Sequence, residues 1–564
     1  MRIFANGILF LLFIGGSPLW TQESSNKKEI QQLKSLVTAQ QKALEQQQKA
    51  LELQQTQIQE LRLSVAEEKL TLTGGDQHAT LVPAVGHVTV PNSGYHPAPN
   101  MPPQAGQTAP VVNQEPTPEQ QEKVEEELQR GPEIADVTPD TPAIPLGPAK
   151  IRLIGYPALT TVWRSTNSGG NVGTSFASLP FSSTVPGNTS EFRLSPQSTR
   201  LAIRADADLT TSKVAGYFEM DFGGSPNSGT IAVTSSSYTF RIRQAWFDYS
   251  NSKWEFTGGQ LFSLMTPVKK DILPWPGDVA TTQVVDTNYV AGLVQGRYPQ
   301  VRFVYRASKT TSLGFSLENP EQQVGNNVTY PSALTSILTT QYNTGSNELK
   351  VPNMTPDFVF KGSYTNKFGD RSFHMDGGMV MRVFRSYNGT CNSCKDYAFG
   401  YGGNLNIYAD VTKKVRLVLD GFGSEGAGRY IGGLAPDAIV RASGYISPIP
   451  SYSWVSGFEI APNKATGFYV YYSGLYAQRK STANSDGSCC VGYGNPGANL
   501  NADRVIQEFT GGYSRVVWKH ENLGSVQWGG QYAYAWLAPW VPAGNGTSKA
   551  SANMVFGQVR YNLP

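Results

Sequence analysis

Apolar and polar residues alternate with a period of two in short segments from about residue 150 onward. In residues 201–209 the odd positions are all apolar, whereas Arg204, Asp206 and Asp208 occupy even positions. Successive side chains of a β-strand point to opposite faces, so this pattern predicts strands with one apolar and one charged face. A membrane barrel turns the apolar face outward into lipid. Few helical segments are present to cover so large a sheet, and this favours a barrel over a soluble sandwich.

Seven short turns that contain lysine separate these strands in pairs, and a long polar loop follows each pair. Seven turns join fourteen strands, and one further strand at each end makes sixteen. Short turns on one side and long loops on the other are typical of outer-membrane barrels. The turns lie at Thr210–Lys213, Ser250–Lys253, Ala307–Thr311, Thr365–Asp370, Thr412–Lys414, Ala461–Ala465 and Lys519–Gly524. The predicted fold is therefore mainly β, with a 16-stranded antiparallel transmembrane barrel over residues 150–564.

The composition fits this prediction. Charged residues make up 16% of the 564 residues, aromatic residues reach 11%, and there are 57 glycines. Beyond the N-terminus, no stretch approaches the roughly 18 apolar residues that a spanning helix needs. Barrel strands need only about 10 residues each, and half of these face a wet lumen. The mixture suits a barrel with aromatic girdles better than a cytosolic enzyme.

The first 69 residues predict export and self-association. Met1 and Arg2 precede the apolar run Ile8–Ile14, so residues 1–21 are interpreted as a signal peptide. Residues 27–69 carry a heptad repeat that predicts an α-helical coiled coil in the periplasm. One helix alone could not bury this seam, so we expect oligomers, and a trimer would match the usual symmetry of large porins. The apolar heptad positions are Ile30, Val37, Leu44, Leu51, Ile58 and Val65.

Residues 70–149 predict a proline-rich linker between the coil and the barrel. One short helix is expected within it: Thr117 can cap the helix, Pro118 suits the first turn, and Gly131 ends it. Further along the chain, the segment from Leu264 to Gly296 is unusually long for a barrel loop. This segment either folds into the lumen as a constriction or forms an ordinary external loop, and the sequence leaves both open.

Positive charge is concentrated in the barrel. Residues 150–564 hold 36 Lys and Arg against 26 Asp and Glu, whereas residues 21–149 hold 9 against 17. Arg241 and Arg243 alternate with Phe240 and Ile242, so both arginines should face the lumen, where charge is tolerated. Arginine presents forked donors to carboxylate oxygens, and such residues bias a pore toward anions. The alternative is a generic charged wall. Predicted pore-lining residues are Arg200, Arg204, Glu219, Asp221, Arg241, Arg243, Arg302 and Arg306.

The sequence gives little support for catalysis or metal binding, whereas its cysteines indicate disulfides. Cys391, Cys394, Cys489 and Cys490 all fall in predicted external loops, and an exported chain meets an oxidising compartment, so disulfides are expected. Four cysteines allow three pairings, and the sequence does not choose among them. The sequence contains no nucleophile and base at a spacing that would predict an enzyme. We expect no catalytic residues, no metal site, no cofactor and no nucleic-acid partner.

Several segments together resemble the DcaP-like trimeric outer-membrane porins. These are QSTRLAIRADADL, VAGYFEMDFGG, FRIRQAWFDY, WEFTGGQLFSLM and RYPQVRFVY within residues 197–305, and GFGSEGAGRY at 421–430. The resemblance implies an N-terminal periplasmic coiled coil and uptake of small, often negatively charged solutes such as dicarboxylates. It also implies that the predicted arginines line the constriction, with Glu219 and Asp221 beside them. The chain departs from this family in its last residue, Pro564, in its long linker and in its cysteine-bearing loops.

The sequence thus predicts a homotrimeric porin in the outer membrane of Gram-negative bacteria, with the N-terminal region in the periplasm. The channel would pass small hydrophilic solutes by diffusion and would prefer anions. The alternative is a structural envelope protein, in which the barrel is an anchor and the coil reaches toward peptidoglycan. Peptidoglycan is then a further partner, beside lipid. Neither the physiological solute nor gating can be predicted from the sequence.

Overall fold

A computed structural model of the protein describes residues 142–168, 171–224, 238–274, 283–325, 327–344, 351–388, 394–495, 502–542 and 549–564. The predicted signal peptide, the coiled coil with all six of its heptad positions, and almost all of the linker lie outside these residues. Cys391 does as well. Within the described part, β1 (Ile144–Leu146) lies in the last residues that the sequence assigned to the linker.

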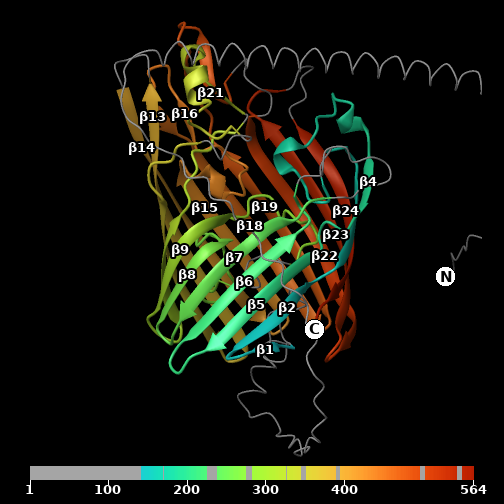
Figure 1. The fold of residues 1–564 in the computed structure, drawn as a ribbon. Helices are drawn as coiled ribbons and strands as arrows, with labels where there is room; N and C mark the ends of the chain where they lie inside the picture. The colour runs from blue at the N-terminus through green and yellow to red at the C-terminus, as the bar shows by residue number, and fades with distance from the viewer. Residues whose placement is uncertain are drawn as a thin grey trace, which may run out of the picture. The chain divides into compact units, whose positions relative to one another are not determined.

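One large antiparallel sheet of nineteen strands forms the body of the structure (Figure 1). Besides β1, its first strands are β2 (Ala149–Tyr156), β3 (Ala158–Arg164), β4 (Glu191–Ser195), β5 (Arg200–Asp208), β6 (Lys213–Asp221), β7 (Arg241–Ser250), β8 (Trp254–Phe262), β9 (Arg297–Arg306) and β10 (Thr311–Glu318). The others are β12 (Asp357–Phe368), β13 (Arg371–Asn388), β14 (Cys394–Thr412), β15 (Val415–Glu425), β18 (Pro450–Asn463), β19 (Thr466–Ala477), β22 (Asp503–His520), β23 (Gly524–Pro539) and β24 (Ala550–Asn562).

The pairing of these strands closes the sheet into a barrel. From β5 onward each strand of the sheet pairs with the next one along the chain, as far as β24. The last strand then pairs with β3, with Met554 opposite Arg164 and Arg560 opposite Ala158. On the other side of the seam, β2 pairs with β5 and β3 pairs with β4. The prediction of a mainly β, antiparallel barrel is therefore confirmed.

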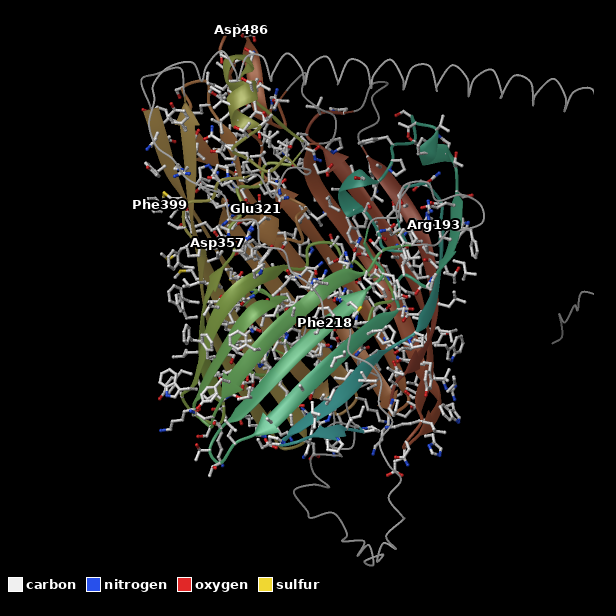
Figure 2. The ribbon with its side chains drawn as sticks, viewed as in Figure 1. Arg193, Phe218, Glu321, Asp357, Phe399 and Asp486 are labelled. Atoms are coloured by element: carbon white, nitrogen blue, oxygen red, sulfur yellow. A yellow bond between two sulfur atoms is a disulfide. The ribbon has the colours of Figure 1, made fainter. Side chains whose placement is uncertain are left out.

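The outward face of the wall is apolar. Along β5, Leu201 and Ile203 are exposed, whereas Ala202 between them is buried. On β13, Met379 and Met381 are exposed, and the alternate residues Val380 and Arg382 are buried. Figure 2 shows Phe399, which is also largely exposed, on the outside of the barrel. An exposed apolar surface of this extent is unusual for a soluble protein and is expected of a wall that faces lipid.

The short turns connect the strands where the sequence predicted them. Two residues, Gly369 and Asp370, separate β12 from β13, and three residues, 251–253, separate β7 from β8. All seven predicted turns are confirmed, and Figure 1 shows them at the lower end of the barrel. Large aromatic residues stand beside several turns; the rings of Trp254 and Tyr305, for example, lie 4.5 Å apart. Such a belt is typical of the membrane interface.

The long loops at the other end form small sheets of their own. β11 (Val328–Thr329), β20 (Lys480–Ala483) and β21 (Cys489–Tyr493) form a three-stranded sheet, and β16 (Ala438–Val440) pairs with β17 (Ile446–Pro448). The helical segments of this part are short: η1 (Phe176–Ser178), η2 (Pro186–Asn188), η4 (Ser332–Leu334), α3 (Thr335–Leu338) and η6 (Gly428–Tyr430). Among the described residues, no helix is long and apolar enough to cross a membrane.

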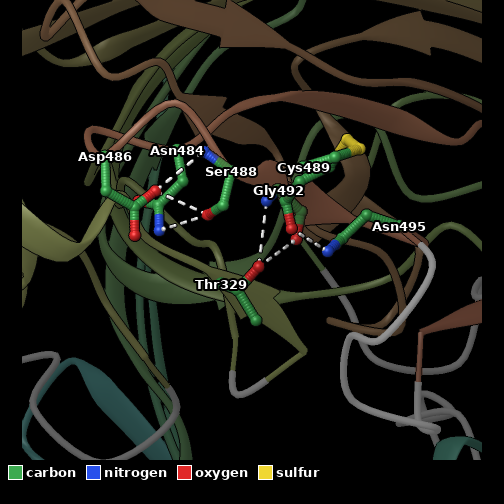
Figure 3. The surroundings of a disulfide bond; sticks show 8 residues. Thr329, Asn484, Asp486, Ser488, Cys489, Gly492 and Asn495 are labelled. Atoms are coloured by element: carbon green, nitrogen blue, oxygen red, sulfur yellow. Dashed lines mark hydrogen bonds between the residues drawn. A yellow bond between two sulfur atoms is a disulfide. The ribbon is translucent and has the colours of Figure 1, made fainter.

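A disulfide joins Cys489 to Cys490 at the start of β21 (Figure 3). The vicinal pairing was one of those that the sequence left open. Thr329 accepts a hydrogen bond from the Gly492 backbone at 2.9 Å through Oγ1, which also donates to the Gly492 carbonyl. These bonds tie the loop before β12 to the loop before β22, so two segments far apart in the sequence hold one another over the same end of the barrel.

Candidate functional site

Two described arms of the segment 264–296, residues 264–274 and 283–296, contact inward-facing side chains of the barrel wall, which favours the constriction over an ordinary external loop. Its first arm touches the inner face of several strands that lie far apart around the wall. Lys361 on β12 donates to the Thr266 carbonyl at 2.7 Å, and Asn404 on β14 donates to the Met265 carbonyl at 2.6 Å. Lys269 forms an ion pair with Glu459 on β18 at 2.9 Å. A segment that reaches β12, β14 and β18 from their inner side has to cross the barrel.

The second arm of this segment, residues 283–296, is held by β22 and β23, which follow β18 and β19 around the wall. The backbone N–H groups of Val285 and Asp286 both donate to Oε1 of Gln531 on β23, at 2.6 and 3.1 Å. The Ala291 N–H donates to Glu508 on β22 at 2.9 Å. Asp286 in turn accepts hydrogen bonds from the backbone and hydroxyl of Thr174. Burial raises the pKa of the Asp286 carboxyl, although these hydrogen bonds oppose the shift.

Gly292 explains how closely this arm can approach the wall. Its φ angle is +83°, a conformation that side-chain-bearing residues rarely adopt. A Cβ atom at this position would lie only 2.1 Å from the carbonyl oxygen of Gly474 on β19. The backbone of the segment therefore rests directly on the backbone of the barrel wall, and only glycine fits there.

Five of the eight predicted pore-lining residues lie together on β5, β6 and β7. Arg243 Nε is 2.6 Å from Glu219 and Arg243 Nη1 is 2.8 Å from Asp221. Arg241 forms two hydrogen bonds with Asp221, at 3.0 and 2.7 Å. Arg200 lies 3.8 Å from Glu219. Forked donors that face carboxylates in this way are strong and geometrically specific.

The two arginines of β7 have different surroundings. The side chain of Arg241 is 42% exposed, whereas that of Arg243 is 3% exposed. Arg243 also donates to the hydroxyl of Tyr289, which belongs to the segment that crosses the lumen. Of these two arginines, only Arg241 is substantially exposed. Arg243 is enclosed because it joins the wall to the crossing segment.

A β-bulge places Arg243 in this position. Glu219 is opposite Gln244 and Met220 is opposite Ile242, so Arg243 has no residue opposite it in the ladder. A bulge inserts one extra residue and bends the strand. As a result Arg243 and Gln244, although adjacent in sequence, are both buried, while Ile242 and Phe247 are exposed to the outside. Sequence alternation alone does not reveal this shift of register.

A further arginine, which the sequence analysis did not select, belongs to this group. Arg297 at the start of β9 interacts electrostatically with Arg243 and Arg241, and its guanidinium lies 5.7 Å from the centre of the Phe262 ring. We call these six residues the arginine cluster: Arg200, Glu219, Asp221, Arg241, Arg243 and Arg297. With every group ionised, the cluster holds four positive and two negative charges.

The other three predicted residues lie apart from the cluster. Arg204 is 2.6 Å from Asp206, an acid on its own strand. Arg302 is buried and donates to the Phe262 carbonyl at 2.6 Å, where β8 ends. Arg306 forms an ion pair with Glu255 and lies 3.5 Å from Asp271. The contacts of Arg302 and Arg306 join β9 to β8 and to Asp271.

The structure also contains a second buried group of charges that the sequence analysis did not select. Arg382 on β13 is 2.9 Å from Asp357 and 2.8 Å from Asp437, and Arg429 is 3.0 Å from Asp357. Tyr430 donates to Asp357 at 3.0 Å. Figure 2 marks Asp357 beside Glu321, whose backbone carbonyl also accepts from Arg382. Arg429 and Tyr430 end the segment 421–430 noted above, but their shared partner Asp357 begins β12, more than 70 residues earlier in the chain, so no local pattern predicts these contacts.

Within the described ranges, no group of three or more His, Cys, Asp or Glu side chains is arranged to hold a metal ion. His374 contacts Asp376 at 3.2 Å and Thr365 at 2.7 Å. Asp376 is itself paired with Lys361 at 2.9 Å beneath the crossing segment. These contacts give the histidine a place in the wall rather than beside a nucleophile.

The sequence matches no family model, and no curated protein matches it significantly. Its fold does match solved structures. It is similar to the outer-membrane channel DcaP of Acinetobacter baumannii, with 16% identity and a TM-score of 0.52, over 74% of this chain and 97% of that channel. It is also similar to an anion-selective porin from Comamonas acidovorans, with 12% identity and a TM-score of 0.41, over 74% of this chain and 100% of that porin.

Identity this low shows the fold alone. The first of these likenesses confirms the predicted resemblance to DcaP-like porins at the level of the fold. The described part of the chain thus has the fold of a bacterial outer-membrane channel, with an apolar outer wall and a segment that crosses the lumen.

Proposed function

We propose that the protein is an outer-membrane porin that lets small hydrophilic solutes diffuse passively and prefers anions, dicarboxylates being one example. The observation that carries this proposal is the arginine cluster, in which four guanidinium groups stand against two carboxylates. This excess of positive charge would line the lumen, and Arg243 contacts Tyr289 of the 283–296 arm, which would narrow it.

The physical basis is the behaviour of fixed charge in a narrow aqueous passage. Low-dielectric walls focus the field of a charge, and rings of Arg or Lys favour anions over cations. The half-exposed guanidinium of Arg241 is the member of the cluster best placed to meet a passing solute. Asp221, which also pairs with Arg243, holds Arg241 in place. Arg204, Arg302 and Arg306 then contribute to the lumen wall rather than to selectivity.

The barrel wall is proposed to consist of sixteen strands. Only Pro157 separates β2 from β3, and four residues separate β4 from β5. Each of these pairs continues in the same direction and is counted here as one bent strand, while the short β1 forms a hairpin with β2 at the rim. A barrel of 16 to 18 strands leaves an aqueous channel rather than a packed core.

The remaining predictions extend this proposal to the whole chain. Residues 1–21 would direct export, residues 27–69 would form a coiled coil in the periplasm, and residues 70–149 would link the coil to the barrel. A single helix has nowhere to bury the heptad seam, so the coil supports self-association, and a homotrimer would match the usual symmetry of large porins. The protein would then span the bacterial outer membrane with its N-terminal region in the periplasm.

Purified protein in planar lipid bilayers tests the proposal. Stable conductance steps are expected, and under a salt gradient the reversal potential should have the sign of an anion-preferring pore. Failure to conduct would contradict the porin function. If deletion of residues 27–149 then detached the outer membrane in cells, the structural alternative would be supported. Conductance with cation preference would contradict only the assigned role of the arginine cluster.

A further inference from the structure

A cavity of about 720 Å³ lies on the long-loop side of the barrel, beside the arginine cluster. The ends of β8 and β9 form one side of it, with Gln260 and Arg297. The loops before β12 and after β15 form the other side, with Asn319, Asn353 and Gly433. Its volume falls within the range that binds small molecules. Unlike most such sites, it is lined mainly by polar side chains.

Arg297 is the unusual member of this lining. Its Nη1 atom is buried and has no hydrogen-bond partner among the described residues. No carboxylate in that part of the chain pairs with it, whereas Arg241 and Arg243 both pair with Asp221. A buried donor without a partner carries a cost in free energy, which a ligand bearing a carboxylate would remove. Arg429, the other arginine of the lining, is already paired with Asp357.

The rest of the lining indicates what else the ligand carries. Six residues with side-chain amides line the cavity: Gln260, Gln295, Gln323, Asn319, Asn343 and Asn353. The Oδ1 atom of Asn353 is likewise buried without a partner in the described part of the chain. Amides both donate and accept hydrogen bonds, so they suit hydroxyl groups, which do the same. Glu321 also lines the cavity and would disfavour a second carboxylate.

From this arrangement we infer that the cavity binds a small monocarboxylate with several hydroxyl groups, the chemistry of a sugar acid. Arg297 holds the carboxylate, and the amides hold the hydroxyl groups. The inference rests on the proposed porin function and sharpens it, since it selects hydroxylated monoanions over dicarboxylates. A solute bound here lies next to Arg241 and Arg243, so the site would collect anions in front of the constriction.

Calorimetric titration of the purified native oligomer with gluconate tests the inference. Substituting Arg297 with glutamine (R297Q) removes the charge but keeps a polar side chain, and should weaken gluconate binding about tenfold or more. Arg297→Lys retains the charge but loses the forked donors. Its gluconate affinity should lie between those of the native protein and R297Q. The matched control is Arg193→Gln, which removes the same charge from the half-exposed Arg193 on β4 and should leave the affinity unchanged. Succinate and glucose should both bind more weakly than gluconate.

Each contrary result is distinct. Equal gluconate affinity in Arg297→Gln and in the native protein overturns the inference, as does a native oligomer that binds no gluconate. Tighter binding of succinate that depends on Arg297 overturns the preference for monoanions. If Arg297→Gln does not fold, the gluconate affinities of Arg297→Lys and Arg193→Gln are compared instead. Weaker binding in Arg297→Lys supports the inference, and equal binding overturns it. Conductance of the same native preparation is read separately, so a failed porin function is not confused with a failed binding site.

Discussion

The guanidinium of Arg243 lies 2.6 Å from the carboxylate of Glu219, and both side chains are almost fully buried. Charges removed from water need such partners, because an unpaired buried charge costs several kcal/mol. The same guanidinium reaches Asp221 and the hydroxyl of Tyr289. Arg243 therefore fixes the wall to the crossing segment, and the neighbouring Arg241, which is half exposed, is left to act on solutes.

This division of roles predicts a difference in stability between the two arginines. Replacing Arg243 with Gln leaves Glu219 and Asp221 without their shared partner, and should lower the free energy of unfolding by about 3 kcal/mol. Arg241→Gln should cost less than about 1 kcal/mol, because Asp221 keeps Arg243 and the site is partly wet. Urea titration of the refolded barrel in vesicles measures both. Equal losses in the two variants would contradict the assignment.

Selectivity should respond in the opposite order. Arg241→Glu moves the local charge by two units at the exposed position and should shift the reversal potential toward cations. Lys253→Glu, which makes the same change in a short turn at the far end of the barrel, should shift it much less. The double replacement of Arg241 and Arg243 by Glu is a poorer test, since it would bury a third carboxylate beside Glu219 and Asp221. An unmoved reversal potential in Arg241→Glu, with the barrel intact, would show that this residue does not govern permeation.

Much of the barrel could be predicted because it depends on local rules. Alternation with a period of two fixes which side chains face lipid, and the short turns that contain lysine mark the strand ends. Both signals lie within a few consecutive residues, as in 201–209. The same alternation predicts that Arg241 and Arg243 share a face, and both pair with Asp221.

The details of the site depend on contacts that alternation cannot show. The burial of Arg243 follows from a bulge and from Tyr289, which lies 46 residues further along the chain. Arg302 and Arg306 satisfied the same pattern as Arg241, yet they pair with a backbone carbonyl and with Glu255. Arg297, at a strand entry beside the long loop, was not among the eight predicted pore-lining residues. Its proposed role in binding rests on the absence of a hydrogen-bond partner for its Nη1 atom among the described residues, and the sequence does not show this.

The crossing segment should come loose when its acceptor on β23 is removed. Gln531→Leu keeps the size of the side chain but leaves the N–H groups of Val285 and Asp286 and the hydroxyl of Tyr469 without their acceptor. Each buried unpaired donor costs about 1–3 kcal/mol, so the second arm should leave the wall. Larger single-channel conductance and a higher size limit in liposome swelling are expected. Gln507→Leu is the control, since Gln507 accepts from Tyr472 on the exposed side. Unchanged conductance in Gln531→Leu would indicate that the other anchors suffice.

The vicinal disulfide should matter little for the stability of the barrel. Cross-links stabilise largely by closing long loops in the unfolded chain, and a bond between adjacent residues closes almost none. The hairpin of β20 and β21 is also held by its own ladder and by Thr329. Replacing Cys489 and Cys490 together with Ser should therefore leave the heat-induced shift on gels within a few degrees of the native protein. A large loss of heat resistance would show that this loop region depends on the bond.

The last prediction concerns the N-terminal heptads. If residues 27–69 form a coiled coil, Leu44 and Leu51 lie in its apolar seam. Changing both to Asp would place unpaired charge there and should weaken the oligomer and reduce the helical signal of the isolated 27–69 peptide. Gln47→Asp and Gln54→Asp serve as a control of equal charge at positions that are already polar, and should have a smaller effect. Light scattering of the full-length protein and circular dichroism of the peptide measure the two consequences. Unchanged mass together with an unchanged helical signal would remove the coiled coil from the proposed assembly, and the oligomer would then have to be held by the barrel wall alone.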